Sequence, residues 1–217
     1  MKKNWASVPL GKILVERQEV PDAGALSSGE IPIVSKISFK DGKILLRTDG
    51  ETKTGMILAR QGDLVVSGIN AAKGAIAIYE GEKPIAATIH YGAYIPKEKK
   101  IDVNYLWWLL RSQAFKDLLK KHVPGGIKTE LKSKRFLPIP VPLPPLPEQR
   151  KIVAQIKSIA EKIKEANSLH NQSASKTEYI IKSLLSKSFD KYSQKYGLKF
   201  IGELLQEANY GTSQYCD

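Results

Sequence analysis

Cysteine is almost absent from this sequence, since Cys216 is the only one in 217 residues. A lone cysteine excludes a disulfide framework and a zinc site made of several thiolates. The three histidines, His90, His122 and His170, do not have the spacing of metal ligands. No metal or cofactor site is therefore expected in this chain.

Long hydrophobic runs are missing too. The apolar stretches 106–110 and 136–146 are shorter than the about 20 residues that cross a bilayer, and prolines interrupt the second. No apolar segment follows the basic start at Met1–Trp5, so a secretory signal is not expected. We expect a cytoplasmic protein that makes no membrane contact.

Motifs of nucleotide and DNA chemistry are absent as well. The sequence has no Gly-x-x-x-x-Gly-Lys-Ser/Thr loop and no Gly-x-Gly-x-x-Gly segment. Leucines flank Pro144 and Pro145, so this pair lacks the neighbours of a methyltransferase Asn/Asp-Pro-Pro-aromatic motif. Glu51 and Lys53 form a short acid–base string, which leaves a stand-alone nuclease as an outlying alternative. The main expectation is a chain that catalyses no reaction.

Positive charge is what the sequence has in excess. Lys and Arg number 34 against 22 Asp and Glu, which gives a net charge of +12 and a pI near 9.6. Such an excess favours a polyanionic partner such as nucleic acid, although it also serves solubility. The hydrophobic share of 42% is that of an ordinary globular protein.

Residues 1–147 have the pattern of an α+β domain with a mostly antiparallel or mixed sheet. Short runs rich in β-branched residues predict strands, and Gly-containing turns separate them. The predicted strands cover residues 31–34, 43–47, 63–67 and 75–79. One helix is expected from a cap at Asp102 to Leu119, where apolar residues recur at helical spacing.

A proline-rich linker closes this domain at residues 137–147. Six prolines in eleven residues exclude a helix and a central strand. The linker is expected to run extended, in a polyproline II conformation, and to pack along a surface. A ligand for SH3-type domains is the alternative interpretation.

A long helix is predicted over residues 148–189, because apolar residues step by alternating intervals of four and three. This seam is formed by Ile152, Ile156, Ile159, Ile163, Ala166, Ile180 and Leu184. Its middle is polar and includes His170, which we interpret as a seam residue without chemistry. A rod of roughly 60 Å cannot bury its seam on so small a domain, so a coiled-coil partner is expected.

The last segment, 190–217, contains a weak repeat of the beginning of the chain. Gly197–Leu205 is similar to Trp5–Leu14, because both place an apolar residue, a glycine, a charge and an apolar pair in that order. We interpret this segment as the truncated start of a second copy of the first domain.

Pro142–Val153, which reads PLPPLPEQRKIV, resembles a family signature. In the specificity subunits of type I restriction-modification systems, a similar segment joins a target recognition domain to a long helix. Trp5–Gly11 resembles the opening of these subunits, and Ser67–Ala75 a segment of their recognition domains. Asn209–Ser213 resembles the beginning of their second recognition domain.

The resemblance implies a sequence-specific DNA-binding subunit that directs methyltransferase and restriction subunits to a split target. AdoMet, ATP and Mg²⁺ are then expected only on those partner subunits. Family members usually carry two recognition domains and two antiparallel helices, whereas this sequence has one of each. It is therefore a fragment or a natural half subunit. A half subunit is expected to form a homodimer through its long helix and to read a palindromic site on double-stranded DNA.

Candidate DNA-binding residues are of two kinds. Basic side chains suit phosphates, whereas Asn70 and Lys73 lie on a glycine-flanked loop that suits base reading in the major groove. The predicted set is Lys36, Lys53, Asn70, Lys73, Gly74, Lys128, Lys132, Lys134 and Arg135. The alternatives are a solvated basic loop at 124–135 and a tight turn with Asn70 in the left-handed conformation.

A second function stays open at this point. The chain is alternatively a non-catalytic scaffold or regulatory half subunit that binds methyltransferase subunits through its helix and binds DNA poorly alone. A steep salt dependence of DNA binding would argue against that alternative.

Overall fold

The computed structural model describes residues 5–48, 55–97, 99–122 and 130–198. The chain divides into two compact units, Met1–Ser158 and Ile159–Asp217, called unit 1 and unit 2 below. Within the described residues, every helix is too short or too polar to cross a membrane. The predicted division into a recognition domain over 1–147, a helix over 148–189 and a third segment over 190–217 stays a prediction. Beyond Leu198 the third segment lies outside the described residues.

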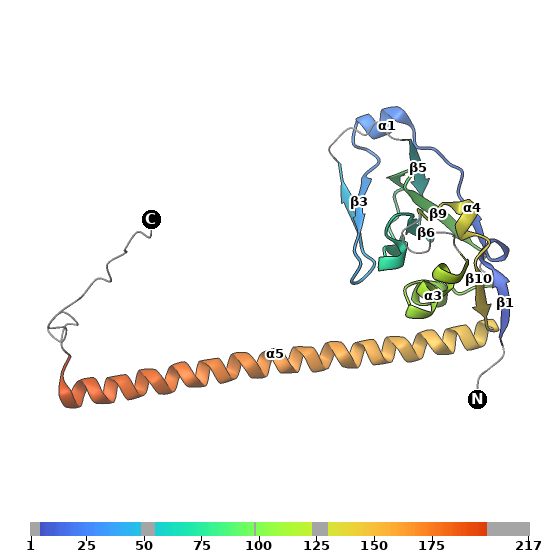
Figure 1. The fold of residues 1–217 in the computed structure, drawn as a ribbon. Coiled ribbons are helices and arrows are strands. Elements are labelled where there is room, and N and C mark those ends of the chain that lie inside the picture. The colour runs from blue at the N-terminus through green and yellow to red at the C-terminus, as the bar shows by residue number, and fades with distance from the viewer. Residues whose placement is uncertain (1–4, 49–54, 98, 123–129, 199–217) are drawn as a thin grey trace, which may run out of the picture. The chain divides into compact units, whose positions relative to one another are not determined.

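Unit 1 combines short strands with short helices (Figure 1). Its described strands are β1 (Ala6–Pro9), β2 (Leu14–Glu16), β3 (Ile33–Ile37), β4 (Ile44–Arg47), β5 (Met56–Ala59), β6 (Leu64–Ser67), β7 (Ile76–Ile78), β8 (Ile85–Thr88), β9 (Tyr91–Pro96) and β10 (Pro140–Leu143). Its helical elements are η1 (Leu10–Lys12), α1 (Ala23–Ser27), η2 (Ala71–Lys73), α2 (Val103–Leu110), α3 (Gln113–His122), α4 (Ser133–Phe136) and the start of α5 (Leu146–Tyr196). The four predicted strands correspond to β3, β4, β6 and β7.

The described strands form sheets in the orders β2-β9-β6-β7, β4-β3-β8-β5 and β1-β10. Neighbouring strands are antiparallel except for β3 and β8, which are parallel. The predicted α+β class with a mostly antiparallel or mixed sheet is therefore confirmed, and the long helix follows it as expected.

The inner strand β6 of the sheet β2-β9-β6-β7 is buried on both faces. Successive side chains of a strand point to opposite faces, so Leu64 and Val66 join the core under the helices while Val65 faces the second four-stranded sheet. All three side chains are at most 1% exposed. The even hydrophobicity of β6 is explained by this position, because neither of its faces meets water.

The single helix expected from Asp102 to Leu119 is two helices in the structure. Asp102 does cap α2, since its carboxylate accepts hydrogen bonds from the backbone N–H groups of Asn104 and Tyr105. The break comes at Ser112, whose hydroxyl donates to the carbonyl of Leu109 and accepts from the backbone N–H of Phe115. A serine side chain that bonds the local backbone competes with the helix ladder, and this ends α2 and starts α3.

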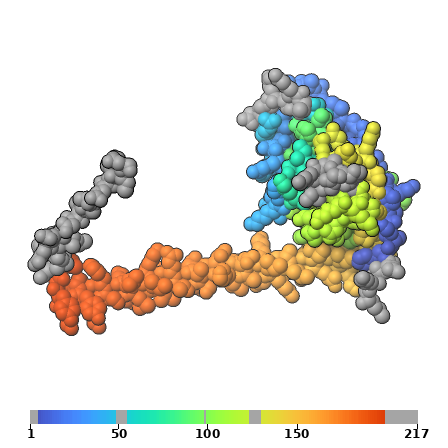
Figure 2. Space-filling model, viewed as in Figure 1, coloured from blue at the N-terminus to red at the C-terminus, as the bar shows by residue number. Residues whose placement is uncertain are grey.

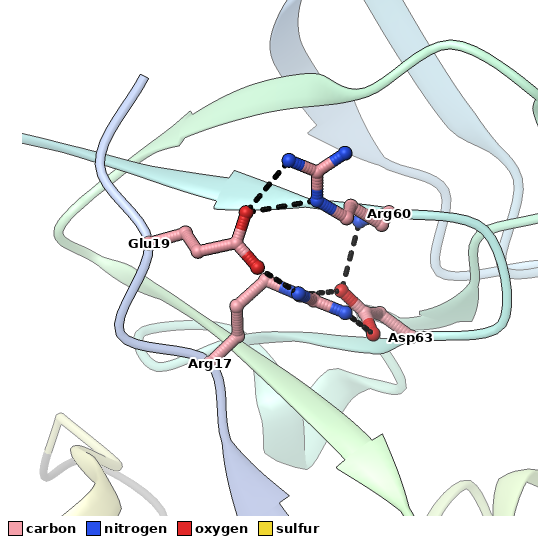
Figure 3. A network of polar contacts seen from close by, with 4 residues as sticks. All are labelled: Arg17, Glu19, Arg60 and Asp63. Carbon is pink, nitrogen blue, oxygen red and sulfur yellow. Dashed lines mark hydrogen bonds and ion pairs between the residues drawn. The ribbon is translucent and has the colours of Figure 1, made fainter. Parts of the chain in front are cut away.

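A polar network fixes the turn between β5 and β6 (Figure 3). The Asp63 carboxylate, 1% exposed, accepts from Nε and Nη2 of Arg17 at 2.5 and 2.9 Å and from the backbone N–H of Arg60 at 2.8 Å. Glu19 bridges Arg60 and Arg17. The hydrogen bond from Arg60 lowers the pKa of Glu19, and the hydrogen bond to Asp63 raises the pKa of Arg17. The network ties this turn to the segment that follows β2.

The proline-rich linker is extended in its middle, where β10 is a strand. The expectation of an extended chain over all of 137–147 is wrong at both ends, because Leu137 and Pro138 form a turn and Leu146 and Pro147 already belong to α5. β10 pairs antiparallel with β1, and Val8 lies opposite Val141. Pro140 and Pro142 lack an N–H donor, and they are tolerated because this two-stranded sheet consists of edge strands only. The pairing brings the beginning of the described chain beside the residues that lead into α5.

Gln149, in the first turn of α5, is fully buried at 0% exposure. Its Oε1 accepts from the backbone N–H of Asp102 at 2.8 Å, and its Nε2 donates to the carbonyls of Pro144 at 2.7 Å and Lys100 at 3.2 Å. One side chain thus joins the linker, α5 and the cap of α2. Gln149, the second residue of the Glu-Gln pair in the family signature, therefore has a structural role.

The helix α5 runs from Leu146 to Tyr196, past the expected end at Phe189. Its first turns belong to unit 1, where Val153 is buried and Ile152 packs against the core. Unit 2, taken by itself, is different. Its described residues, from Ile159 to Leu198, are all exposed except the half-buried Ser183 and Ser193 (Figure 2, orange to red). The apolar seam of unit 2 is therefore open to solvent in the single chain.

Candidate nucleic-acid interface

The predicted reading loop, Ser67–Gly74, connects β6 to β7 and contains η2. Asn70 precedes η2 with a φ of −117°, so the left-handed conformation considered for it is wrong. Gly74 takes that conformation instead, with a φ of +91°. The backbone of Asn70 closes the turn by accepting from the N–H groups of Lys73 and Ala75. The side chain of Asn70 makes no cap hydrogen bond to η2.

The segment before α4 is bonded directly to this loop. Gly68 donates its N–H to the carbonyl of His90 at 2.7 Å and accepts from the N–H of Leu131 at 2.8 Å. A Cβ at Gly68 would lie 3.0 Å from the His90 carbonyl and 3.3 Å from that of Leu131. This close approach explains the glycine at the start of the loop. It also places the basic segment 130–135 beside the start of the loop, at Gly68.

The basic segment is anchored by α4. Phe136 is fully buried and packs on Tyr94 and Phe115, with ring centroids 4.7 and 6.5 Å apart. Burial raises the pKa of Tyr94 to about 12, so its hydroxyl stays protonated and hydrogen-bonds Ser133 at 3.0 Å. These contacts hold one face of the four-residue helix inward. Its other residues are free to carry charge on the surface.

The predicted side chains Lys132, Lys134 and Arg135 are exposed on this surface. Arg135 donates to the carbonyl of Glu130 at 3.2 Å, and Lys132 lies 3.6 Å from the Glu130 carboxylate. Glu130 also pairs with Nδ1 of His90 at 2.9 Å, and this hydrogen bond lowers the pKa of Glu130. Glu130 is thus paired with His90 and Lys132, and among the described residues no carboxylate forms an ion pair with Lys134.

A cavity of about 450 Å³ lies where the loop, the basic segment and β9 meet. Gly68, His90, Tyr91, Lys132 and Lys134 are among its lining residues. Its lining thus includes the cations Lys132 and Lys134 together with the carboxylates of Glu16 and Glu130. No group of three or more His, Cys, Asp or Glu side chains in the described part of the chain is arranged to hold a metal ion.

The predicted DNA-binding residues that the structure describes fall mainly into two groups. Asn70, Lys73 and Gly74 lie on the loop. Lys132, Lys134 and Arg135 lie on the segment 130–135, which is hydrogen-bonded to Gly68 of the same loop. Lys36 is exposed on β3, in the hairpin with β4. Lys53 and Lys128 lie outside the described residues, as does Glu51 of the nuclease alternative. That these residues contact DNA stays a prediction.

The predicted partner helix divides at Ser158. Ile152 and Ile156 are half-buried in unit 1, whereas Ile159, Ile163, Ala166, Ile180 and Leu184 are exposed in unit 2. The exposed isoleucine and leucine side chains are 55–58% accessible. Sequence reasoning missed that the first two seam residues serve the domain. The sequence did contain one indication of this: Val153 is apolar but lies off the seam, so the first turns of the helix have a wider apolar face than a coiled coil needs.

Comparison with known proteins gives a consistent picture. Residues 2–173 match the model of the type I restriction modification DNA specificity domain. The chain is 31% identical over 128 residues to the type I restriction enzyme MjaVIII specificity subunit of Methanocaldococcus jannaschii, covering 54% of this chain and 30% of that protein. It is 27% identical over 94 residues to the EcoDI specificity subunit of Escherichia coli, covering 43% and 21%.

Solved structures share the fold. The HsdS subunit of Thermoanaerobacter tengcongensis superposes with a TM-score of 0.64 at 19% identity, over 86% of this chain and 50% of that one. A chain from a study of type I R-M complex assembly gives a TM-score of 0.60 at 19% identity, over 87% and 50%. This chain spans about half the length of these structures and less of the curated relatives. On the family match, it belongs to the type I restriction modification DNA specificity domain family.

Proposed function

We propose that this chain recognises one part of a split target on double-stranded DNA and directs methyltransferase and restriction subunits to it. Its family and its two curated relatives, both specificity subunits of type I restriction enzymes, support this proposal. The chain contributes recognition and no chemistry. AdoMet, ATP and Mg²⁺ belong to the partner subunits, and the complex acts in the cytoplasm.

The observation that carries the proposal is the hydrogen bond between Leu131 of the basic segment 130–135 and Gly68, at the start of the loop that carries Asn70 and Lys73. Phosphate contacts position a protein on DNA, and base contacts specify the sequence. Exposed Lys132, Lys134 and Arg135 suit the first task. Asn70 and Lys73 suit the second, because an amide or an ammonium reads donors and acceptors in the major groove. One surface therefore offers both kinds of contact.

The exposed seam of unit 2 supports a second copy of this chain as a partner. A coiled coil buries such residues against another helix. In an antiparallel pair centred between Asn171 and Gln172, residues equally far from that centre face each other. The facing pairs are Ile159–Leu184, Ile163–Ile180, Ala166–Thr177 and His170–Ser173. The isoleucine and leucine side chains then meet one another, Ala166 meets Thr177, and the polar centres coincide.

DNA binding tests the proposal directly. The full chain is titrated against a fluorescent duplex at several salt concentrations, and a target is selected from random duplexes. We expect a binding constant that falls steeply with salt, and a selected site with two half-sites in two-fold relation. Binding that is weak and independent of salt would favour the scaffold function instead.

Charge-removal variants locate the surface. The double variant Lys73→Ala with Lys134→Ala should lower the slope of log K against log salt by about one unit for each lysine. Lys83→Ala is the matched control, because Lys83 is exposed at the opposite end of the β6–β7 pair. An equal loss in the control would show that net charge, and not this surface, governs binding.

A further inference from the structure

Arg111 connects two loops that the sequence places far apart. It ends α2, and its guanidinium donates to the carbonyl of Gly74 at 2.5 Å, in the reading loop. The same group donates to the carbonyls of Phe39 and Lys40 at 3.1 and 2.9 Å, in the turn between β3 and β4. It also lies 4.6 Å from the ring of Trp107. The planar guanidinium can reach both loops at once because its donors form a rigid fork.

Two glycines make this arrangement possible. Gly42 in the β3–β4 turn has a φ of +71°, and a Cβ there would lie 2.8 Å from Nη1 of Arg111 and 2.9 Å from Trp107. Gly74 is left-handed on the other loop. Trp107 adds a hydrogen bond from its indole N–H to the carbonyl of Ile76 at 2.9 Å. The spacing between the two loops is thus set by side chains of α2.

The β3–β4 turn has the composition of a DNA contact. Phe39 is 51% exposed, although it is a large aromatic side chain, and Lys40 is exposed beside it. Lys73 of the reading loop lies 5.7 Å from the centre of the Phe39 ring. Lys36 is exposed on the same hairpin. An apolar group among cations suits the methyl group of thymine or a sugar, with phosphates on either side.

We propose that the Phe39–Lys40 turn is a second DNA-reading element and that Arg111 is the positioning residue that fixes it beside the Asn70–Gly74 loop. This inference rests on the proposed function and adds residues to the same surface. Phe39 contacts a base or sugar, Lys40 contacts a phosphate, and Arg111 touches no DNA. Burial among neutral carbonyls lowers the pKa of Arg111, in keeping with a guanidinium that serves the protein interior.

The test compares a selected target duplex with a duplex of unrelated sequence. Phe39→Ala should weaken binding of the target about tenfold and leave the unrelated duplex nearly unchanged. Lys40→Ala should weaken both equally and lower the salt slope by about one unit. Val20→Ala is a matched control for Phe39→Ala, since Val20 is also an exposed apolar residue, at 74%.

Arg111→Lys tests positioning, because the compact ammonium lacks the planar fork with which the guanidinium bonds both loops. We expect a loss of target preference of about tenfold with little change for the unrelated duplex. In a double-mutant cycle, Arg111→Lys should add almost nothing to Phe39→Ala, because both remove the same contact. A purely structural role would instead make the two losses additive. Circular dichroism and a melting curve show whether each variant is folded. If Arg111→Lys is unfolded, the binding of Phe39→Ala decides whether the turn reads DNA.

The outcomes separate this inference from the proposed function. If Phe39→Ala and Lys40→Ala bind like the unaltered chain while the Lys73 and Lys134 variant does not, the turn makes no DNA contact and the proposed function stands. If the unaltered chain binds no duplex, both fail together. A loss in Phe39→Ala that appears only with the selected target, together with a loss in Lys40→Ala that is equal for both duplexes, supports the inference.

Discussion

Unit 1 and unit 2 treat apolar side chains in opposite ways. In unit 1 the strands β3, β7 and β8 bury isoleucine side chains to at most 5% exposure, at Ile33, Ile37, Ile76 and Ile85. In unit 2 Ile163 and Ile180 remain 56% and 55% exposed, although they have the same chemistry. A domain buries its own apolar side chains, whereas a lone amphipathic helix leaves its apolar face exposed until another helix packs against it.

The largest effect that tests this comparison is expected at the seam of unit 2. Ile163→Asp with Ile180→Asp should convert a dimer into a monomer of 24.1 kDa, measured by light scattering. The loss amounts to about 6 kcal/mol of association free energy or more, because four isoleucine side chains leave an apolar interface. Ser168→Asp with Ser175→Asp is the control, since these residues lie on the helix face opposite the seam. A dimer that survives the seam variant would place the interface elsewhere.

In unit 1 the largest expected effect is at Asp63. Asp63→Ala removes the buried carboxylate and leaves the Arg17 guanidinium, 12% exposed, without its main partner. Breaking a buried pair in this way costs about 3–5 kcal/mol. Urea unfolding of the full chain measures it. Glu19→Gln, at the 42% exposed end of the same network, should cost much less. Similar losses for the two variants would contradict the assigned difference in burial.

A smaller effect is expected where unit 1 meets the beginning of α5. Gln149→Leu keeps the volume but leaves the N–H of Asp102 and two carbonyls without a partner. Buried unsatisfied groups of this kind cost about 2–4 kcal/mol in total. Gln155→Leu is the control, because Gln155 is exposed on the same helix. Equal stabilities would mean that water replaces the three lost bonds.

The smallest effect concerns the pH dependence of the basic segment. The pKa of Glu130 is lowered by its bond to His90, so the ionised form stabilises the fold. That contribution is complete above the unfolded pKa of about 4.3 and is lost as pH falls through the lower folded pKa. Glu130→Gln should therefore lower the free energy of unfolding at neutral pH by about a few tenths of a kcal/mol, seen as a slightly lower melting temperature, and should leave it unchanged in acid. The same loss at both pH values would exclude a charge effect.

The sequence predicted four of the described strands, and each of them lies next to a turn that contains glycine. β3 and β4 flank Gly42, and β6 and β7 flank Gly74; both glycines have the positive φ values of real turns. β1 and β10 were missed because Pro9, Pro140 and Pro142 oppose a strand assignment locally. Only their mutual pairing makes these segments strands. The break between α2 and α3 depends on a single hydroxyl, at Ser112, which a periodicity argument cannot weigh.

The candidate site was likewise predicted from the sequence only in part. Asn70, Lys73 and the basic run near Lys134 were found as local patterns of charge and glycine. That the loop and the run are bonded through Gly68 and Leu131 could not be foreseen, because this is a contact across the fold. Arg111 gave no signal of its own. An arginine at the end of a helix is ordinary in sequence, and its role appears only from the carbonyls that surround it.

The sequence by itself determined the basic charge, the α+β pattern, the extended middle of the linker and a long helix with an apolar seam. These follow from composition and from periodicity over neighbouring residues, which act through short-range geometry. The tertiary structure alone decided which residues share a surface, why Gln149 is buried, and where the seam ceases to serve the domain, at Ile159. These depend on contacts between residues far apart in the chain, whose free energy is gained only after the chain has closed the intervening loops.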